Sequence, residues 1–592
     1  MLTKTKFKIS LENRLRKILD SEDDIRFLSK EIYRKVINVT DGIASKREDN
    51  SKSLFSEKDI VLIAYAQHIS KKGQTKLASL KEFTDKYLNG AINSIHLLPF
   101  YPSNGDGGFS VIDYYEVDPD FGSWEDIESF NYKLMFDAVF NHISSKSSWF
   151  QAFLNDEEKY KNYFISFKDE ELDESLKEKL AKVIRPRAHS LLTSYIKKNG
   201  EKVNTWTTFS EDQIDLNFAE AQVLLELVEI LIFYITEGAK LIRLDAVPFM
   251  WKEIGTNCSN LCKTHEIIKL FREIVSEIDP SCLIISEANI PHQENVSYFG
   301  NGYDESHMIY NFSLAPLIIY ANYKSSSRYL FDWSSHIELP SEETTFFNVT
   351  ATHDGIGVRP LKGLIKEEEI EDLCQETLKR GGEIGYKTKL NAAGEMIKSP
   401  YELNITWTSM LLDENLDIET NTRKIVSSHL AVAAFPGMPA MYLNNFLASK
   451  NSYKTYEQSK IKRDLNRELY LLDELEKDLS ENNLRQSVFN ALTEALKIRS
   501  TEKAFNPLSS KKDFHISDKI WSFLRINPHN GDRVIVLYNV SKENIAININ
   551  DLKNSAHLDI EIQFYDLLSD FKTDDNTKEI GLKPYQTMWL KY

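Results

Sequence analysis

Short apolar runs recur along the chain, and stretches with the 3.6-residue spacing of amphipathic helices separate them. Strand-like runs that alternate with helix-like segments indicate parallel βα units, and eight of them match a closed barrel. We therefore predict an α/β fold, a (β/α)8 TIM barrel with inserted loop subdomains and a C-terminal antiparallel β domain. The eight runs are residues 60–67, 94–100, 134–140, 240–247, 283–288, 307–312, 346–352 and 435–442.

The remaining segments divide the chain around this barrel. Residues 1–55 form a charged leader with a helical pattern, and residues 56–504 carry the barrel. Two connections are unusually long, at about 143–218 and about 355–404, and long connections at the functional face of a fold commonly shape its site. From residue 505 to residue 592, short alternating apolar runs with Asn, Asp and Gly between them predict a small antiparallel β domain.

Composition narrows the class of function. The chain has 592 residues and a formal net charge of −17, with opposite charges interspersed, which argues against nucleic acid or an anionic membrane as a partner and favours a small-molecule ligand. No segment resembles a signal peptide or a membrane span, so we expect a cytoplasmic protein. Cys258, Cys262, Cys282 and Cys374 are too few for a disulfide framework and lack zinc-site spacing, so no metal is predicted.

Four of the apolar runs end in, or just before, an ionisable side chain. These side chains are His142, Asp245, Glu287 and Asp354. A buried strand rarely ends in such a group unless the side chain emerges into a site. Because the active site of a barrel lies at the carboxyl ends of its strands, we expect the four groups to meet in space.

Asp245 and Glu287 match the needs of glycosidic bond cleavage. That reaction takes one protonated carboxyl to release the leaving oxygen and one ionised carboxylate below the anomeric carbon. Neighbouring strands lie about 4.8 Å apart, which is compatible with the roughly 5 to 5.5 Å carboxyl separation of a retaining enzyme. Arg243 faces the same side of its strand as Asp245, and we expect it to hold that carboxylate ionised at neutral pH. A purely structural pair of Arg243 and Asp245 is the alternative.

Two histidines accompany these carboxyl groups. His353 and Asp354 at another strand end can grip sugar hydroxyls while the carboxylate stabilises developing oxocarbenium charge. His142 has the same placement. Its alternative interpretation is a hydrogen-bonded core histidine.

Taken together, the segments DAVFNH, RLDAV, EAN and HD resemble, in order, the four conserved regions of the α-amylase superfamily, glycoside hydrolase family 13. The resemblance implies Asp245 as nucleophile, Glu287 as general acid and base, and Asp354 as transition-state stabiliser. His142, Arg243 and His353 would support them by binding substrate.

Further stretches are similar to the sucrose phosphorylase branch of that family: residues 96–127, the RPR at 185–187, and HDGIGVRPLKGL from residue 353. The resemblance implies that Asp106 binds outer hydroxyls of the glucosyl ring and that Phe109 forms an apolar platform. Arg463 would pair with Asp106, although spacing alone does not separate Arg463 from Arg467.

The resemblance to the sucrose phosphorylase branch also implies residues that bind phosphate. Arg187 matches the phosphate-binding arginine of that branch, and Arg359, on a loop after the seventh strand, could help present the anion. Guanidinium groups bind phosphate through paired hydrogen bonds, and a bound anion in a guarded pocket is needed to compete with water for a glucosyl intermediate.

Within the branch, residues 251–272, 291–317 and 399–406 look most similar to glucosylglycerate phosphorylases. Phe249 stands where sucrose phosphorylases use a tyrosine, and a phenylalanine cannot hydrogen-bond phosphate or acceptor. An acidic aglycone calls for another cation, for which Lys362 and Lys450 are candidates that no sequence argument separates.

We therefore expect a retaining α-glucoside phosphorylase, with glucosylglycerate favoured as the donor. Inorganic phosphate is the co-substrate, no cofactor is expected, and the protein would be a monomer or a homodimer. The alternatives are a phosphorylase of sucrose, sucrose phosphate or glucosylglycerol, a family 13 hydrolase or transglucosylase, and a non-catalytic sugar-binding relic. Intact Asp245, Glu287 and Asp354 argue against the relic.

Overall fold

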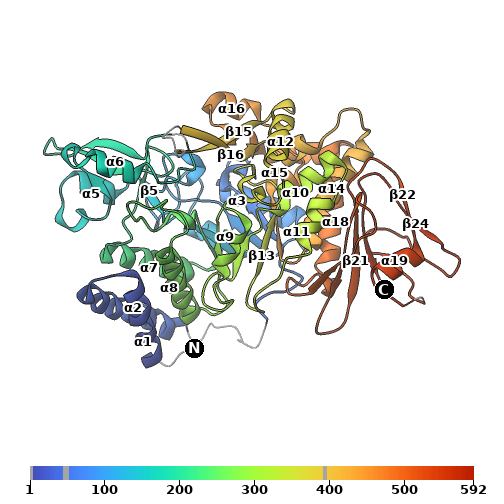
Figure 1. Cartoon of the computed structure of the whole chain (residues 1–592), viewed down its shortest axis with the longest axis horizontal. Coiled ribbons are helices and arrows are strands. Elements are labelled where there is room, and N and C mark those ends of the chain that lie inside the picture. The colour runs from blue at the N-terminus through green and yellow to red at the C-terminus, as the bar shows by residue number, and fades with distance from the viewer. Residues whose placement is uncertain (1–3, 44–52, 188, 391–395, 560) are drawn as a thin grey trace.

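The structure, a computed structural model, describes residues 4–43, 53–187, 189–390, 396–559 and 561–592. Its centre is a closed barrel of parallel strands in the order β1-β3-β4-β10-β11-β12-β13-β17 (Figure 1). Each of the eight predicted apolar runs supplies one barrel strand, so the predicted fold class is confirmed. The strands are β1 (Val61–Ala64), β3 (Ser94–Leu97), β4 (Lys133–Ala138), β10 (Ala239–Leu244), β11 (Leu283–Ser286), β12 (Met308–Tyr310), β13 (Thr345–Val349) and β17 (Met438–Tyr442).

Helices follow the barrel strands along the chain. Local chemistry sets their ends: the Thr75 side chain accepts a hydrogen bond from the Ala78 N–H at the start of α3, and Asp417 does the same with Thr420 at the start of α14. The main helices are α3 (Lys76–Tyr87), α4 (Trp124–Glu128), α7 (Ala221–Thr236), α8 (Cys262–Ile278), α9 (His292–Val296), α10 (Leu314–Lys324), α11 (Arg328–Ser334), α14 (Ile418–Ala434), α15 (Leu443–Phe446), α16 (Tyr453–Ser459), α17 (Leu472–Ser480) and α18 (Leu484–Arg499).

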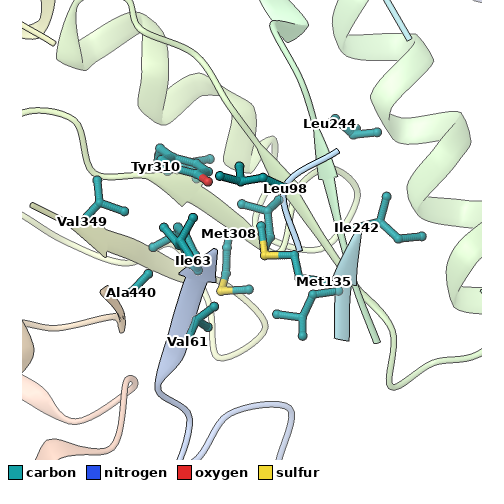
Figure 2. Packing of buried hydrophobic residues seen from close by; sticks show 14 of the residues in the cluster. Val61, Ile63, Leu98, Met135, Ile242, Leu244, Met308, Tyr310, Val349 and Ala440 are labelled. Carbon is teal, nitrogen blue, oxygen red and sulfur yellow. The ribbon is translucent and has the colours of Figure 1, made fainter. Parts of the chain in front are cut away.

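The apolar core lies in and around the barrel. Figure 2 shows buried side chains from several barrel strands gathered in one cluster, among them Val61, Met135, Ile242, Met308 and Val349. Burial of this apolar area is the main favourable contribution to folding, and it holds the strand ends in fixed positions.

Two excursions rise from the carboxyl ends of the strands. The first, after β4, contains β5 (His142–Ser144) paired with β9 (Gln213–Asp215), the helices α5 (Ser148–Leu154) and α6 (Glu174–Leu180), and a sheet in the order β6-β8-β7. The strands of that sheet are β6 (Ser166–Phe167), β7 (Leu192–Ile196) and β8 (Lys202–Trp206).

The second excursion follows β13 and forms a sheet in the order β14-β16-β15. Gly355, at φ 97°, permits its sharp entry turn, since a Cβ there would collide with the Leu403 carbonyl oxygen. The elements of this excursion are β14 (Ile356–Gly357), α12 (Glu367–Lys379), β15 (Glu383–Leu390), β16 (Met396–Asn404) and, next along the chain, α13 (Trp407–Leu411).

The N-terminal segment forms a helical hairpin of α1 (Lys4–Ile18) and α2 (Glu22–Ile43) that packs against α7 and α8 (Figure 1). Along α1, Phe7, Leu11, Leu15 and Ile18 recur at helical spacing and are fully buried, so the charged leader presents one apolar stripe to the barrel helices.

The C-terminal segment lies at the other end of the molecule from that hairpin (Figure 1). Its antiparallel sheet has the order β19-β20-β21-β25-β23, beside a second pair of β22 and β24, as expected for this region. The buried Arg525 donates to the Ala434 carbonyl at the end of α14 and so ties this sheet to the barrel. The elements are β19 (Ser510–Asp513), β20 (Ile520–Ile526), β21 (Arg533–Asn539), β22 (Ile545–Asn548), α19 (Ile549–Ser555), β23 (Tyr565–Asp566), β24 (Glu579–Leu582) and β25 (Thr587–Lys591).

Among the described residues, no helix is both long enough and apolar enough to cross a bilayer. Within the same residues, no group of three or more His, Cys, Asp or Glu side chains is placed to hold a metal ion.

Candidate active site

Asp245 and Glu287 come together because their strands are paired in register. Leu244 of β10 pairs with Ser286 of β11, so each carboxyl residue is the next one beyond that pair. The Glu287 N–H donates to the Leu244 carbonyl at 3.0 Å, which extends the ladder to the site. Ala246 then adopts a left-handed conformation at φ 50° and donates its N–H to Glu287 Oε2 at 3.0 Å. The turn after β10 therefore ties the two carboxyl residues to each other.

Arg243 places its guanidinium group beneath the carboxyl groups of Asp245 and Glu287 and close to both. Its guanidinium is 2.9 Å from Asp245 Oδ1 and 4.0 Å from Glu287 Oε2, and it forms a close ion pair with Asp137 of β4. Asp137 in turn contacts the buried His96 of β3 at 2.6 Å. A polar chain thus runs across the buried strands to the predicted nucleophile, and each charge in it has an opposite partner.

Asp245 and Glu287 share a buried environment that raises the pKa of both carboxyl groups. Burial is the strongest influence on Asp245 and raises its pKa to about 8, since it outweighs the attraction of Arg243 and is reinforced by repulsion from Glu287. Burial also raises the pKa of Glu287. The attraction of Arg243 therefore does not keep both carboxyl groups ionised at neutral pH.

Two interacting carboxyl groups titrate as a pair, and this pair keeps one proton until the pH approaches about 8. Because Arg243 is 2.9 Å from Asp245 but 4.0 Å from Glu287, the geometry favours negative charge on Asp245 and the proton on Glu287. One ionised and one protonated carboxyl is the state that double displacement requires.

Asp354 has the opposite electrostatic environment. Burial acts to raise its pKa, but Arg463 at 2.8 Å and Arg467 at 3.6 Å hold the pKa well below its ordinary value. Asp354 therefore stays ionised across the physiological range, as a carboxylate must if it is to stabilise positive charge on a sugar. Of the two arginines that the sequence left open, Arg463 lines the cavity, and Arg467 is buried beside it.

The pairing around Asp106 is more complex than predicted. Arg187 Nη2 lies 2.7 Å from Asp106 Oδ2, whereas Arg463 is 3.8 Å away. Arg463 makes its paired contacts with Glu402 of β16, at 2.8 and 2.9 Å. Arg463 and Asp106 are therefore farther from each other than each is from another partner. The residue closest to Asp106 is Arg187, the predicted phosphate ligand.

The predicted apolar platform has a histidine behind it. The rings of Phe109 and His353 stack with centroids 5.1 Å apart and planes 4° apart. His142 Nε2 lies 2.9 Å from the Phe109 carbonyl oxygen and donates to it. Burial lowers the pKa of His142 to about 4 and that of His353 to about 3, so both rings are neutral at pH 7.

One cavity collects most of the predicted residues at the carboxyl ends of the barrel strands. Arg243 lies beneath it, and Arg359 is buried behind its wall, with Nη1 donating to the Asn289 carbonyl at 3.4 Å. Lys362 and Lys450 are exposed and do not line it. The predicted residues that line the cavity are Asp106, Phe109, His142, Arg187, Asp245, Phe249, Glu287, His353, Asp354 and Arg463.

Several lining residues were not identified from the sequence. Tyr401 and Glu402 enter from the second excursion and Gln213 from the first. None of them ends a barrel strand, so the pattern of apolar runs carried no signal for them. Tyr401 and Glu402 lie within residues 399–406, which resemble glucosylglycerate phosphorylases, whereas Gln213 was marked only by its place in the first long connection.

Lys252 is a further residue that the sequence did not reveal. Its ammonium group is buried, 2.8 Å from Asp215 Oδ2 and 2.8 Å from Asn141 Oδ1. Asp215 also accepts hydrogen bonds from the Thr208 N–H and hydroxyl at 2.7 and 2.6 Å. Since Asp215 pairs with His142 in the β5–β9 ladder, this internal cation anchors the first excursion beside the site.

Comparisons with known proteins agree with this arrangement. The family model described as "Alpha amylase, catalytic domain" matches residues 79–354. A glucosylglycerate phosphorylase from Escherichia coli is 38% identical over 545 residues, covering 91% of this chain and 93% of that protein. One from Spirochaeta thermophila is 38% identical over 539 residues, covering 90% and 89%. The crystal structure of sucrose 6F-phosphate phosphorylase from Thermoanaerobacter thermosaccharolyticum has a TM-score of 0.71 at 23% identity, covering 89% and 98%, and shares the fold.

Removing the buried cation should destabilise the protein. Lys252→Met leaves Asp215 buried without its ammonium partner, so we expect a loss of about 3 to 5 kcal/mol in denaturant unfolding. The double variant Lys252→Met/Asp215→Asn removes both charges and should recover part of that loss. A Lys252→Met protein as stable as the parent would refute the anchoring role.

Proposed function

The chain belongs to the α-amylase family, and we propose that it is a retaining α-glucoside phosphorylase, with glucosylglycerate as its preferred donor. One observation carries the reaction type: Asp245 and Glu287 extend adjacent barrel strands and share one buried guanidinium, that of Arg243. The relatives at 38% identity, which cover most of the chain, support the choice of donor.

In the first step, an oxygen of the Asp245 carboxylate attacks the anomeric carbon. The bond from that carbon to the aglycone oxygen breaks, and Glu287 donates its proton to the departing oxygen. This leaves a glucosyl ester on Asp245, an ionised Glu287 and a free aglycone. Ionised Asp354 stabilises the positive charge that develops on the sugar ring.

In the second step, a phosphate oxygen attacks the same carbon and the ester bond to Asp245 breaks. Two inversions at one carbon preserve the α configuration and give α-glucose 1-phosphate. Phosphate is largely ionised at neutral pH, so its attack depends less on proton removal by Glu287 than the attack of water would. The carboxyl pair then regains its shared proton from solvent.

Selection of phosphate over water rests on the cations of the cavity. Arg187 lines the cavity and lies 2.7 Å from Asp106, the residue predicted to bind the glucosyl ring, and this supports a role for its guanidinium group in binding phosphate there. Arg359, behind Asn289, adds positive charge to the wall without direct contact. Phe249, in contact with Phe209, gives the cavity an apolar face that disfavours water.

We also propose the co-substrate, the cellular location and the oligomeric state of the enzyme. Inorganic phosphate is the co-substrate, no organic cofactor or metal takes part, and small molecules are the only substrates. The protein works in the cytoplasm as a monomer or homodimer. A net charge of −17 supports the absence of a nucleic-acid partner.

The decisive assay separates phosphorolysis from hydrolysis. Purified protein is incubated with glucosylglycerate, sucrose and glucosylglycerol, with and without phosphate, and glucose 1-phosphate and free glucose are measured. We expect phosphate-dependent glucose 1-phosphate, fastest from glucosylglycerate, and none from Asp245→Ala at any phosphate concentration. Phosphate-independent release of glucose would instead identify a hydrolase.

Arg187 should govern the phosphate step. Arg187→Ala removes the proposed anion contact, so the KM for phosphate should rise at least about tenfold, the scale of 1.4 kcal/mol. The KM for the donor should change less. Arg185→Ala provides a matched control, since Arg185 donates to the His189 carbonyl in the same segment. Equal effects of the two substitutions on the phosphate requirement would reject the assignment.

Activity should fall as the pH rises through about 8. The carboxyl pair then loses its last proton and Glu287 can no longer protonate the leaving oxygen, so kcat/KM for the donor declines on the alkaline side. α-Glucosyl fluoride, whose leaving group needs no proton, should lack this alkaline limb at saturating phosphate. The same limb for both donors would contradict the assignment.

A further inference from the structure

A second cavity, of about 210 Å³, lies where barrel helices meet the C-terminal β region. Residues from α10, α12, α13 and α14 form one side, and Lys542 and Tyr585 of the C-terminal segment form the other. None of its lining residues lines the candidate active site. The lining residues are Ile319, Asn322, Tyr323, Ser325, Glu376, Arg380, Met410, Leu411, Asp413, Lys424, Lys542 and Tyr585.

Lys424 of α14 is the unusual residue of this cavity. It is only 6% exposed, and none of the ion pairs within 4.0 Å among the described residues involves its ammonium group, although Asp413 and Glu376 attract it from farther away. Its one described close contact is with the face of the Tyr585 ring, 4.7 Å from the centroid. Burial lowers the pKa of Lys424 to about 8. A buried ammonium with no carboxylate in direct contact is costly, and an anion in the cavity would reduce that cost.

The acidic groups of the cavity already have hydrogen-bond partners close by. Glu376 Oε1 accepts a hydrogen bond from Arg380 Nε at 2.7 Å, and Asp413 Oδ1 accepts two from Asn415 at 3.0 Å each. Arg380 also donates from Nη1 to the Leu412 carbonyl. Because Arg380 and Glu376 neutralise each other, Lys424 and Lys542 face the single remaining carboxylate of Asp413, and this excess of positive charge suits a negative ligand.

The walls are held in place before any ligand arrives. Arg423, next to Lys424, donates to the Pro584 carbonyl at 2.9 Å, and the Thr587 N–H donates to Ser427 Oγ at 2.9 Å. Asn421 binds the loop that carries Asp413 through four hydrogen bonds. Such preorganisation lowers the entropy cost of binding a small molecule.

We propose that this second cavity binds a small oxyanion, a phosphate or carboxylate group on a polyol no larger than a hexose, with Lys424 as the central contact. Tyr323 and Ser325 supply polar groups for hydroxyls, and Ile319, Met410 and Leu411 supply the apolar side. The site is independent of the proposed reaction, because it shares no residue with the cavity that contains Asp245.

The test is calorimetric titration with inorganic phosphate, glucose 6-phosphate and D-glycerate. Arg187→Ala is the parent in every titration, so that binding in the candidate active site is weakened. We expect Lys424→Met to weaken binding of at least one probe tenfold or more. Loss confined to the two phosphates identifies a phosphate site, and loss confined to D-glycerate identifies a carboxylate site. Lys454→Met, which changes an exposed lysine of α16, should stay within twofold of the parent.

Thermal unfolding separates a ligand site from a structural lysine. Without probe, Lys424→Met should be at least as stable as the wild-type protein, because methionine fills the space without the unpaired charge. In the Arg187→Ala background of the titrations, the probe should stabilise the parent more than the variant that also carries Lys424→Met. Binding of all three probes within twofold of the parent, or a destabilised variant with no probe effect on the wild-type protein, would overturn the proposal.

Discussion

The site depends on one buried guanidinium held among carboxylates. Arg243 contacts Asp137 and Asp245 directly and Glu287 at 4.0 Å, all deep in the barrel. Without this cation, three acidic groups in a dry region would each need a proton. Arg243 allows the proposed nucleophile to carry charge while its neighbour keeps a proton. The barrel supplies the rigidity, because its apolar core fixes the strands that carry these side chains.

A second layer of charge surrounds the carboxyl pair. Arg463 joins Asp354 to Glu402 of the second excursion, and Arg187 joins Asp106 to the first. Each excursion thus contributes one charged side chain that meets the barrel residues. A family that performs related chemistry on many substrates can vary these connections and retain the strand ends. The second excursion also reaches the other cavity, where Glu376 and Arg380 lie.

The sequence predicted the barrel, all eight of its strands, and the carboxyl groups at their ends, because those features depend on local apolar runs and on the registry of parallel strands. It also predicted that Arg187 and Arg463 belong to the site, through resemblance to a family. Their ion pairs were not predictable from the sequence. Arg187 forms the close ion pair with Asp106, and Arg463 lies closer to Glu402 than to Asp106. Ion pairs between distant loops depend on relative position, which no local pattern encodes.

By itself, the amino-acid sequence determined which residues end the strands and therefore which chemical groups share one face of the barrel. Only the tertiary structure decided their protonation, since the pKa of Asp245 reflects burial and the distance to Glu287 as much as its neighbour Arg243. The same holds for the buried cations Lys252 and Lys424, which look like ordinary surface lysines in the sequence. Burial and long-range electrostatics arise from packing, and packing exists only in the folded chain.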